Sequence, residues 1–440
     1  MPEEALQEAL KTPYVPPIPS SIEETGLGRG FLTDLAIKAM YLEGSILGYE
    51  LADRMRLPHA GVVEDVLSSL KREQLCEVKG TGGIGSSPGL GRAAYRYDIT
   101  DKGRATAREA MERSQYVGPA PVPLPTYNHG IQRQALNGLM VHRDGLQRAL
   151  SHLVVDEETT AHLGAAVNSR RSIFLFGPPG NGKTAISESI GKLVLRGSLY
   201  IPYAVETGHE VIKVFDAVNH VPEEKASSNK NRHDRRWIRI RRPVITVGGE
   251  LTLSELDLIY ERTSKYYEAP LQMKANGGML LVDDFGRQQA RPRDLLNRWI
   301  VPLEKRADYL TLHTGRKIEV PFDVLIVFAT NLAPKDLVDE AFLRRIRHKI
   351  KIKDPTWDEY RKIFRRVCRQ QGIPYDEQSL AYLIKQHYIE RNRPKRGCHP
   401  RDLIEQLKDV ASYLNVEPAL TRPLIDQACN SYFVDLQSHH

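Results

Sequence analysis

The sequence predicts an α/β fold: a parallel sheet covered by helices on both faces, with a smaller domain before it and a helical domain after it. Three segments in the middle of the chain, IFLF, MLLV and VLIVFA, read as short buried strands and alternate with helical stretches. That alternation is typical of parallel sheets, whose strands are apolar on both faces. The chain has 440 residues, more than one ordinary core holds, so two or three domains are expected.

Composition excludes several classes of protein. The chain is 41% hydrophobic and 27% charged, as soluble globular proteins are, and its apolar runs are far shorter than the ~20 residues of a membrane helix. We therefore expect no membrane insertion. The acidic start, MPEEAL, lacks the pattern of a signal peptide. The four cysteines are scattered without a CxxC pair, which indicates reduced thiols in a cytoplasmic protein.

The first part of the chain predicts a tail and a small helical domain. Residues 1–28 are rich in Pro and Glu and are expected to form an extended tail. Residues 29–117 combine helical spacing with two strands joined by GTGGIGSSPGLG. The expected helices are 31–43, 45–58, 59–73 and 100–113, and the expected strands are 75–80 and 93–100. This order of elements resembles a winged helix-turn-helix domain of the MarR/PadR kind.

Proline marks the boundary of the next domain. Residues 118–128 begin with GPAPVPLPTY, which holds four prolines, and are expected to form a stiff, extended linker. The α/β core is expected at residues 129–352, where the buried-looking strands occur. Residues 353–440 have helical spacing only, so a separate helical domain is expected there.

One loop of the core has the residues that bind phosphate. Residues 173–192, IFLFGPPGNGKTAISESIGK, match G-x-x-x-x-G-K-[ST] between an apolar strand and a helical run. Glycines let the backbone wrap closely, so that N–H groups at the start of the helix cradle phosphate oxygens. Lys183 is expected to reach the β and γ phosphates of ATP, and the Thr184 hydroxyl is expected to bind Mg²⁺. The predicted nucleotide-binding residues are Gly177, Pro178, Pro179, Gly180, Asn181, Gly182, Lys183 and Thr184.

A second apolar run, GGMLLVDDFG, ends on two adjacent carboxylates, Asp283 and Asp284. In phosphate-loop enzymes a neighbouring strand presents one carboxylate to Mg²⁺, and another residue positions the attacking water. We expect Asp283 to bind the metal ion and Asp284 to activate the water. The charge of the metal ion offsets the repulsion between the two acids. Taken alone, the pair also fits an exposed acidic turn.

The core and the helical domain together, residues 130–435, resemble the AAA+ ATPases. FATNL resembles the end of the sensor-1 strand, with Asn331 helping to hold the water. DEAFLRRIRHKI resembles the helix that carries the arginine finger, with Arg345 preferred over Arg344. GCHPRDLIEQL resembles the start of the sensor-2 helix in the lid, with Arg401 reaching the γ-phosphate. Because an arginine finger completes the site of a neighbour, the resemblance implies a homo-oligomeric ring, expected to be hexameric.

Two features place the resemblance in the pre-sensor-1-hairpin branch of the family, which includes MoxR-like ATPases. Residues 310–331 read as a hairpin before the sensor-1 strand, and KANGGMLLVDDF is similar to the matching stretch of enhancer-binding activators. The hairpin tip, residues 313–317, is expected either to face the pore of a ring or to be an ordinary surface hairpin. One residue departs from the pattern: the family commonly has Glu at the position of Asp284. Because the shorter acid holds the attacking water less well, two alternatives to a fully active ATPase stay open: an enzyme that hydrolyses ATP slowly, and a scaffold that ATP gates with little hydrolysis.

Charge bears on what such a motor acts on. Residues 1–120 hold 14 Lys and Arg against 17 Asp and Glu, a net charge of −3. Because the whole chain has a net charge of +7, residues 121–440 carry +10. An acidic N-terminal domain is poorly suited to DNA, because DNA binding takes much of its affinity from neutralised phosphates. We therefore expect remodelling or assembly of a protein client, with action on DNA as the alternative. Residues 225–242, with eight basic residues and one acid, fit either a nucleic-acid contact or a charged strand edge.

Overall fold

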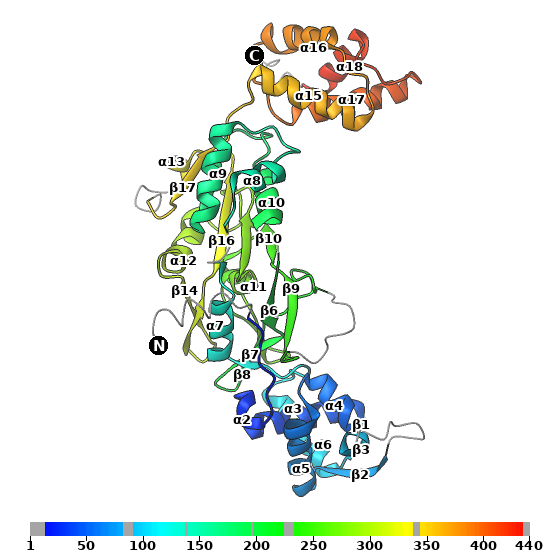
Figure 1. Ribbon diagram of the computed structural model, residues 1–440, viewed down its shortest axis with the longest axis vertical. Helices are drawn as coiled ribbons and strands as arrows, with labels where there is room; N and C mark the ends of the chain where they lie inside the picture. Colours follow the sequence, from blue (N-terminus) through cyan, green and yellow to red (C-terminus); the bar gives the residue numbers. More distant parts are fainter. Residues whose placement is uncertain are drawn as a thin grey trace.

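The computed structural model of the chain describes residues 14–81, 91–136, 140–194, 197–223, 233–337 and 344–433. Figure 1 shows an elongated molecule with a helical domain at each end and an α/β body between them. Among the helices of these residues, none combines the length and the apolar character needed to cross a bilayer.

The central sheet has five parallel strands in the order β10–β13–β16–β5–β17. Their bounds are β5 (Ile173–Phe176), β10 (Val244–Val247), β13 (Gly278–Val282), β16 (Val324–Thr330) and β17 (His348–Lys351). The predicted α/β fold with a parallel sheet is confirmed, and the three predicted strands are β5, β13 and β16. The sequence does not predict β10 and β17, because these edge strands bury only alternate residues. Of the helix expected at 339–350, residues 339–343 lie outside the described residues. The rest of the prediction is wrong, because residues 344–347 form a turn and loop and β17 begins at His348.

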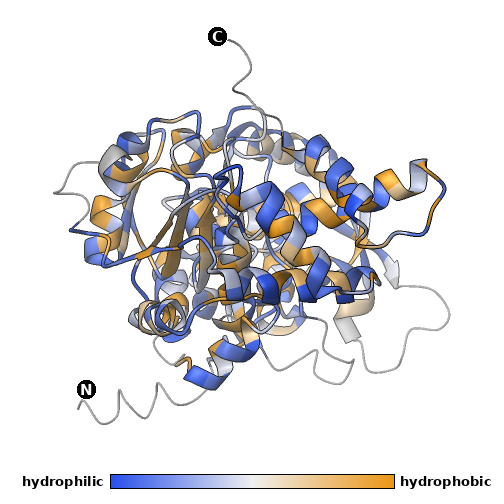
Figure 2. Ribbon diagram, turned by 90° about the horizontal axis from the view of Figure 1, so that it is seen from above, coloured by the Kyte–Doolittle hydropathy of each residue, from blue (hydrophilic) through white to orange (hydrophobic). Residues whose placement is uncertain are grey.

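Helices cover both faces of this sheet, and Figure 2 shows apolar strands enclosed by helices with hydrophilic outer faces. One face carries α8 (Arg143–Ala149), α9 (Glu157–Ser169) and α10 (Lys183–Val194), and the other carries α12 (Pro292–Lys305). Side chains of β13 alternate between the two cores: Met279 and Leu281 join the first, whereas Leu280 and Val282 join the second. Burial on both faces explains why this strand is an unbroken apolar run in the sequence.

The N-terminal domain consists of helices around a small antiparallel sheet in the order β1–β3–β2. Its elements are α2 (Ile22–Thr25), α3 (Arg29–Glu43), β1 (Ser45–Leu47), α4 (Gly48–Met55), η1 (His59–Val63), α5 (Glu64–Arg72), β2 (Cys76–Thr81), η2 (Gly91–Ala94), β3 (Tyr95–Ile99) and α6 (Asp101–Arg113). The four predicted helices and both predicted strands are present. The helix expected at 45–58 begins only at Gly48, because residues 45–47 pair with β3. Most of the segment that joins β2 to β3 lies outside the described residues.

A second five-stranded sheet, in the order β11–β12–β8–β7–β4, lies between the central sheet and the N-terminal domain (Figure 1). Its strands are β4 (Val122–Pro123), β7 (Ala204–Thr207), β8 (Glu210–Lys213), β11 (Ile259–Glu261) and β12 (Tyr266–Glu268). β7 and β8 form a hairpin that turns between Thr207 and Glu210. Gly208 and His209 both have positive φ, 60° and 71°, as a two-residue hairpin turn requires.

Two further antiparallel pairs complete the body of the molecule. β6 (Ser198–Pro202) pairs with β9 (Trp237–Arg241), and β14 (Ala307–Thr311) pairs with β15 (Lys317–Pro321). β14 and β15 are the hairpin predicted directly before β16, and that prediction is confirmed. The short helices of this region are η4 (Leu253–Leu256), α11 (Leu271–Lys274) and α13 (Pro334–Leu337).

Two segments predicted as an extended tail and an extended linker are instead packed parts of the fold. In the expected linker, 118–128, two residues form β4 beside β7, and α7 (Leu124–Arg133) follows directly. Tyr127 of this segment is fully buried. The described part of the expected tail packs as well, because Ile22 and Leu27 belong to the core of the N-terminal domain. Proline misleads here because it suits a strand edge and the first turn of a helix as well as a linker.

The C-terminal domain is helical, as predicted, and we call it the lid domain. Its elements are α15 (Trp357–Gln371), α16 (Glu377–Leu383), η5 (Ile384–Ile389), α17 (His399–Tyr413) and α18 (Arg422–Tyr432). These helices enclose a hydrophobic core of their own. The lid domain lies at the opposite end of the molecule from the N-terminal domain (Figure 1).

Candidate nucleotide-binding site

Three segments meet at the carboxyl edge of the central sheet. β5, β13 and β16 are parallel, with β16 between the other two, and the register pairs Phe176 with Thr330 and Val282 with Phe328. The chain that follows each strand therefore emerges at the same edge of the sheet. These segments are the loop after β5, the two aspartates after β13 and Asn331 after β16. The parallel register thus brings together groups that lie far apart in the sequence.

The loop after β5 is built around glycines. Gly177, Gly180 and Gly182 have positive φ angles of 144°, 77° and 79°. At Gly177 a Cβ atom would lie 2.1 Å from the carbonyl oxygen of Ile352, so a side chain is excluded there. The loop leads directly into α10, which begins at Lys183. Backbone N–H groups at the start of a helix are unpaired within the helix and favour a bound anion.

Lys183 lies at the centre of the site. It is 7% exposed, and its ammonium group donates to the carbonyl oxygens of Gly177 and Pro178 at 3.0 Å each and to Oδ1 of Asn331. Burial lowers the pKa of Lys183, and the charges of the two aspartates after β13 oppose that shift. The ammonium group is therefore within the field of both carboxylates, as a group that binds phosphates beside a metal ion should be.

Thr184 and Asp283 stand side by side. Thr184 Oγ1 donates to Asp283 Oδ2 at 2.8 Å, and Asp283 Oδ1 accepts from the backbone N–H of Asp284 at 2.9 Å. Mg²⁺ prefers oxygen ligands and is commonly held by one or two protein oxygens together with phosphate oxygens and water. The hydroxyl and the carboxylate fit as the protein ligands of one Mg²⁺ ion.

Asp284 has an uncommon backbone conformation, with a φ of 46°. Asp adopts this left-handed region more readily than most residues, because its short polar side chain bonds locally. The Asp284 Oδ1 atom lies 3.4 Å from Nδ2 of Asn331, whose Oδ1 accepts from Lys183. Asn331 therefore links the lysine of the loop to the second aspartate. The backbone conformation also gives a physical reason for a short acid at this position.

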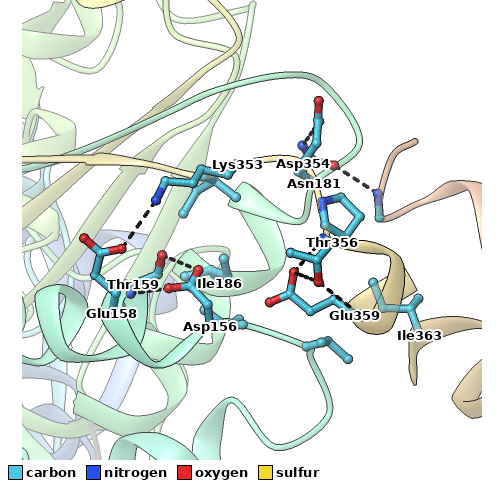
Figure 3. A pocket seen from close by; sticks show the side chains of 15 residues that line it. Asp156, Glu158, Thr159, Asn181, Ile186, Lys353, Asp354, Thr356, Glu359 and Ile363 are labelled. Carbon is cyan, nitrogen blue, oxygen red and sulfur yellow. Dashed lines mark hydrogen bonds and ion pairs between the residues drawn. The ribbon is translucent and has the colours of Figure 1, made fainter. Parts of the chain in front are cut away.

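The lid domain touches the loop directly. The backbone N–H of Gly397 donates to Asn181 Oδ1 at 2.9 Å. Asn181 Nδ2 donates to Asp354 Oδ1 at 2.7 Å (Figure 3), and Arg396 forms an ion pair with the same carboxylate. The sequence predicts a role for Asn181 only as part of the loop backbone. The sequence predicts no role for Asp354 or Arg396, because their contacts depend on how the lid domain packs against the loop.

A cavity of about 360 Å³ opens beside the loop, between the core and the lid domain. On the core side it is lined by residues 152–155 and by the loop with the start of α10, and on the lid side by α15, by residues 397–398 and by Arg401. The guanidinium of Arg401 donates to Asp402 at 3.0 Å, and Asp402 accepts from the Tyr432 hydroxyl at 2.8 Å. The structure therefore brings the predicted sensor-2 arginine to the same cavity as the loop.

The two candidates for the arginine finger lie elsewhere. Arg344 and Arg345 precede β17, whose first residue pairs with Ile173, the first residue of β5. They therefore lie at the amino edge of the sheet, whereas the loop that holds Lys183 lies at the carboxyl edge. The Nε atom of Arg345 donates to Glu304 Oε1 of α12 at 2.6 Å. The structure does not bring these arginines to the site of their own chain.

The tip of the β14–β15 hairpin rests on the second sheet. The His313 ring stacks on Tyr260, with ring centroids 4.3 Å apart, and its backbone N–H donates to the Tyr267 hydroxyl at 2.9 Å. These contacts favour the simpler of the two expectations for the tip, an ordinary hairpin packed on its own chain.

The described part of the basic segment 225–242 also serves the fold. Arg236 is 3% exposed, pairs with Asp234 at 2.8 Å and donates to the Thr25 carbonyl at 2.8 Å. Arg239 pairs with Glu223 at 2.7 Å. These internal contacts favour a structural explanation for this half of the segment. The other half lies outside the described residues.

A protein-family model described as a domain of unknown function (DUF8689) matches residues 356–431, most of the lid domain. No curated protein matches the chain in sequence.

Similar solved structures include NtrX from Brucella abortus. Its ADP complex is 16% identical over 63% of this chain and 56% of that chain, with a TM-score of 0.38; its ATP complex is 16% identical over 64% and 56%, with a TM-score of 0.39. The RuvB Holliday junction branch migration motor of Thermotoga maritima is 12% identical over 63% of this chain and 69% of that chain, with a TM-score of 0.36. This chain thus spans little more than half the length of NtrX. Similarity at this level concerns the general fold alone.

Proposed function

We propose that this chain is an ATP-hydrolysing motor of the AAA+ kind that works as an oligomeric ring. The observation that carries the proposal is the convergence of Lys183, Thr184, Asp283, Asp284 and Asn331 at one edge of a parallel sheet. A cation, a hydroxyl beside a carboxylate, and a second acid are the groups that phosphoryl transfer from a nucleotide to water requires. The helical lid against the loop supports the AAA+ assignment, and the hairpin before β16 favours the pre-sensor-1-hairpin branch.

Each of these residues has a distinct part in the proposed chemistry. The amides of the loop and the ammonium group of Lys183 bind the β and γ phosphates of ATP. Thr184 and Asp283 would hold Mg²⁺, which neutralises phosphate charge when it is bound. Asp284 orients the attacking water and accepts its proton. Asn331 contacts both Lys183 and Asp284, so it keeps the second aspartate turned toward the loop.

Two arginines complete the proposed site. Arg401, on the lid wall of the cavity, approaches the γ-phosphate. Arg345, with Arg344 as the alternative, lies at the edge of the sheet opposite to its own Lys183. It therefore acts on the nucleotide of a neighbouring copy, which makes a closed ring, expected to be hexameric, the active form.

We propose a protein complex as the client of this motor, with the N-terminal domain, a winged helix, as the docking module. The exposed side of α5 carries Asp65 as well as Lys71 and Arg72, so it lacks the uniform positive charge that phosphate contacts favour. The internal contacts of Arg236 and Arg239 support this preference, because they make these side chains unavailable to DNA.

Steady-state phosphate release from ATP by the full chain tests the proposed activity. The wild-type chain is expected to release phosphate in a Mg²⁺-dependent reaction, and Lys183→Ala is expected to abolish both nucleotide binding and turnover. Lys192→Ala, at an exposed position of the same helix, is the matched control and should behave as the wild type. Equal phosphate release by the Lys183→Ala and wild-type chains would overturn the assignment.

A further inference from the structure

The cavity beside the loop has a phosphate end and a second end. Gly180, Gly182 and Thr184 define the phosphate end, and Arg401 lines the same cavity. The remaining wall on the core side is mainly apolar, with Leu153 and Val155 along it, and it also includes the imidazole of His152. An apolar slot next to a phosphate loop has the character of a nucleoside site, because the base buries an apolar face while its edges need hydrogen bonds.

One helix of the lid domain closes this second end. Ile363, Arg366, Val367 and Gln370 of α15 all line the cavity. Their spacing of three and four residues places them on one face of the helix. Figure 3 shows Ile363 and the core residue Ile186 in the adjoining pocket, where they approach it from α15 and from the core. The face of α15 that carries Arg366 therefore forms the lid-domain wall at the second, nucleoside end of the cavity.

Arg366 has a donor that no described residue uses. Its Nη1 atom is buried and makes no hydrogen bond to any of the described residues. A buried unpaired donor is uncommon in proteins and is costly when the group is charged. Guanidinium groups donate and never accept, so the missing partner must be an acceptor.

We propose that Arg366 recognises the nucleoside part of the bound nucleotide, donating from α15 to a ring nitrogen of the base or to a ribose oxygen. The proposal rests on the nucleotide-binding function proposed above and extends it to the lid domain. Arg366 lies within the segment matched by the family model of unknown function. Contact with the nucleoside would give that segment a defined role, because it would bind the end of the nucleotide that the phosphate loop does not reach.

Calorimetric titration of the full chain with two probes, ADP and inorganic pyrophosphate, tests the inference. Pyrophosphate occupies the phosphate end alone, since it has no nucleoside. Arg366→Met keeps the length and the apolar stem of the side chain and removes its donors. It is expected to raise the Kd for ADP about tenfold, the loss of one hydrogen bond from a charged group, and to leave the Kd for pyrophosphate unchanged.

Arg365→Met is the matched control. Arg365 is the neighbouring residue on α15, but it faces Glu377 and Tyr375 of the lid domain, so its loss should leave both Kd values unchanged. If Arg366→Met does not fold, as judged by its circular dichroism, Arg366→Lys carries the same comparison, because it retains the charge and loses the planar fork of donors.

The outcomes separate this inference from the proposed function. An unchanged Kd for ADP in the folded Arg366 variant overturns the role of Arg366 and leaves the phosphate loop intact. An equal rise in both Kd values also overturns it, because Arg366 would then be a phosphate ligand. A wild-type chain that binds neither probe removes the proposed nucleotide site itself.

Discussion

At the scale of single residues, the site is arranged around Asn331. Its amide oxygen accepts from Lys183, and its amide nitrogen lies 3.4 Å from Asp284. A side chain with one donor group and one acceptor group suits this place between a cation and a carboxylate. Asn331, at the end of β16, therefore holds both groups of the proposed reaction in place: Lys183, which binds phosphate, and Asp284, which activates water.

Asp284→Asn separates the proposed catalytic role of this residue from its structural one. Asn tolerates a φ of 46° as Asp does, so the free energy of unfolding should change by less than about 0.5 kcal/mol. The amide cannot accept a proton from water, so turnover should fall by about 100-fold or more while ATP binding persists. Phosphate release and nucleotide titration on the same preparation measure both. Turnover at the wild-type rate would assign proton transfer to another group.

At the scale of secondary-structure elements, α3 shows how a polar residue is tolerated in a core. Lys38 of this helix is 6% exposed, and its ammonium group donates to the Ser114 carbonyl at 2.9 Å. Burial lowers the pKa of Lys38 from 10.5 to about 8. Below about pH 8 the folded domain therefore carries a buried charge that disfavours folding. Between about pH 8 and 10.5 the folded chain binds fewer protons than the unfolded chain, so this penalty disappears as the pH rises.

Lys38→Met is accordingly expected to stabilise the N-terminal domain, and more so at neutral than at alkaline pH. The gain at pH 7 should be roughly 1–3 kcal/mol, less than the full pKa shift implies because one hydrogen bond is lost. At pH 10 the gain should be smaller, because the wild-type lysine is then largely neutral when folded. Urea unfolding of both chains at the two pH values measures the difference. A gain that increases with pH would contradict this account.

At the scale of the whole molecule, the second sheet joins the N-terminal domain to the core. Ala204 of β7 and Val211 of β8 pack in the core of the N-terminal domain. Val205 and Ile212, on the other face of the same strands, pack with the β14–β15 hairpin. That hairpin leads directly into β16 and so to Asn331. Packed contacts therefore run from the N-terminal domain to this hairpin, and from there the chain itself continues into β16 and the candidate site.

The distance between Arg345 and its own Lys183 leads to a prediction about mixtures of chains. Arg345→Ala alone should bind ATP without turnover, and Lys183→Ala alone should not bind ATP. Mixed in equal amounts and allowed to exchange subunits, they should regain activity, because roughly a quarter of the sites in a random ring would pair an intact loop with an intact neighbouring arginine. Phosphate release after mixing measures this. A mixture as inactive as its components, despite exchange seen by native mass spectrometry, would exclude Arg345 as the group supplied by the neighbour.

Much of this architecture is predictable from local patterns. The loop after β5 is predictable because its glycines and its Lys-Thr pair have a fixed spacing. The strands β5, β13 and β16 are predictable because each is buried on both faces and is therefore a continuous apolar run in the sequence. The edge strands β10 and β17 are not predictable in this way, since half of their side chains face outward. Proline at 118–128 predicts a linker, yet the same residues form a strand and the start of a helix once the second sheet is there to receive them.

What the sequence alone determined is the chemistry of the loop and the class of the fold, because both depend on residues that are neighbours along the chain. Tertiary structure alone decided the rest: the contact of Asn331 with both Lys183 and Asp284, the place of Asp354 and Arg396 against the loop, and the position of Arg366, which has an unpaired donor, in the wall of the cavity. These pairings join segments separated by tens to hundreds of residues. No local pattern records them, because they arise only when parallel register and domain packing bring the segments together.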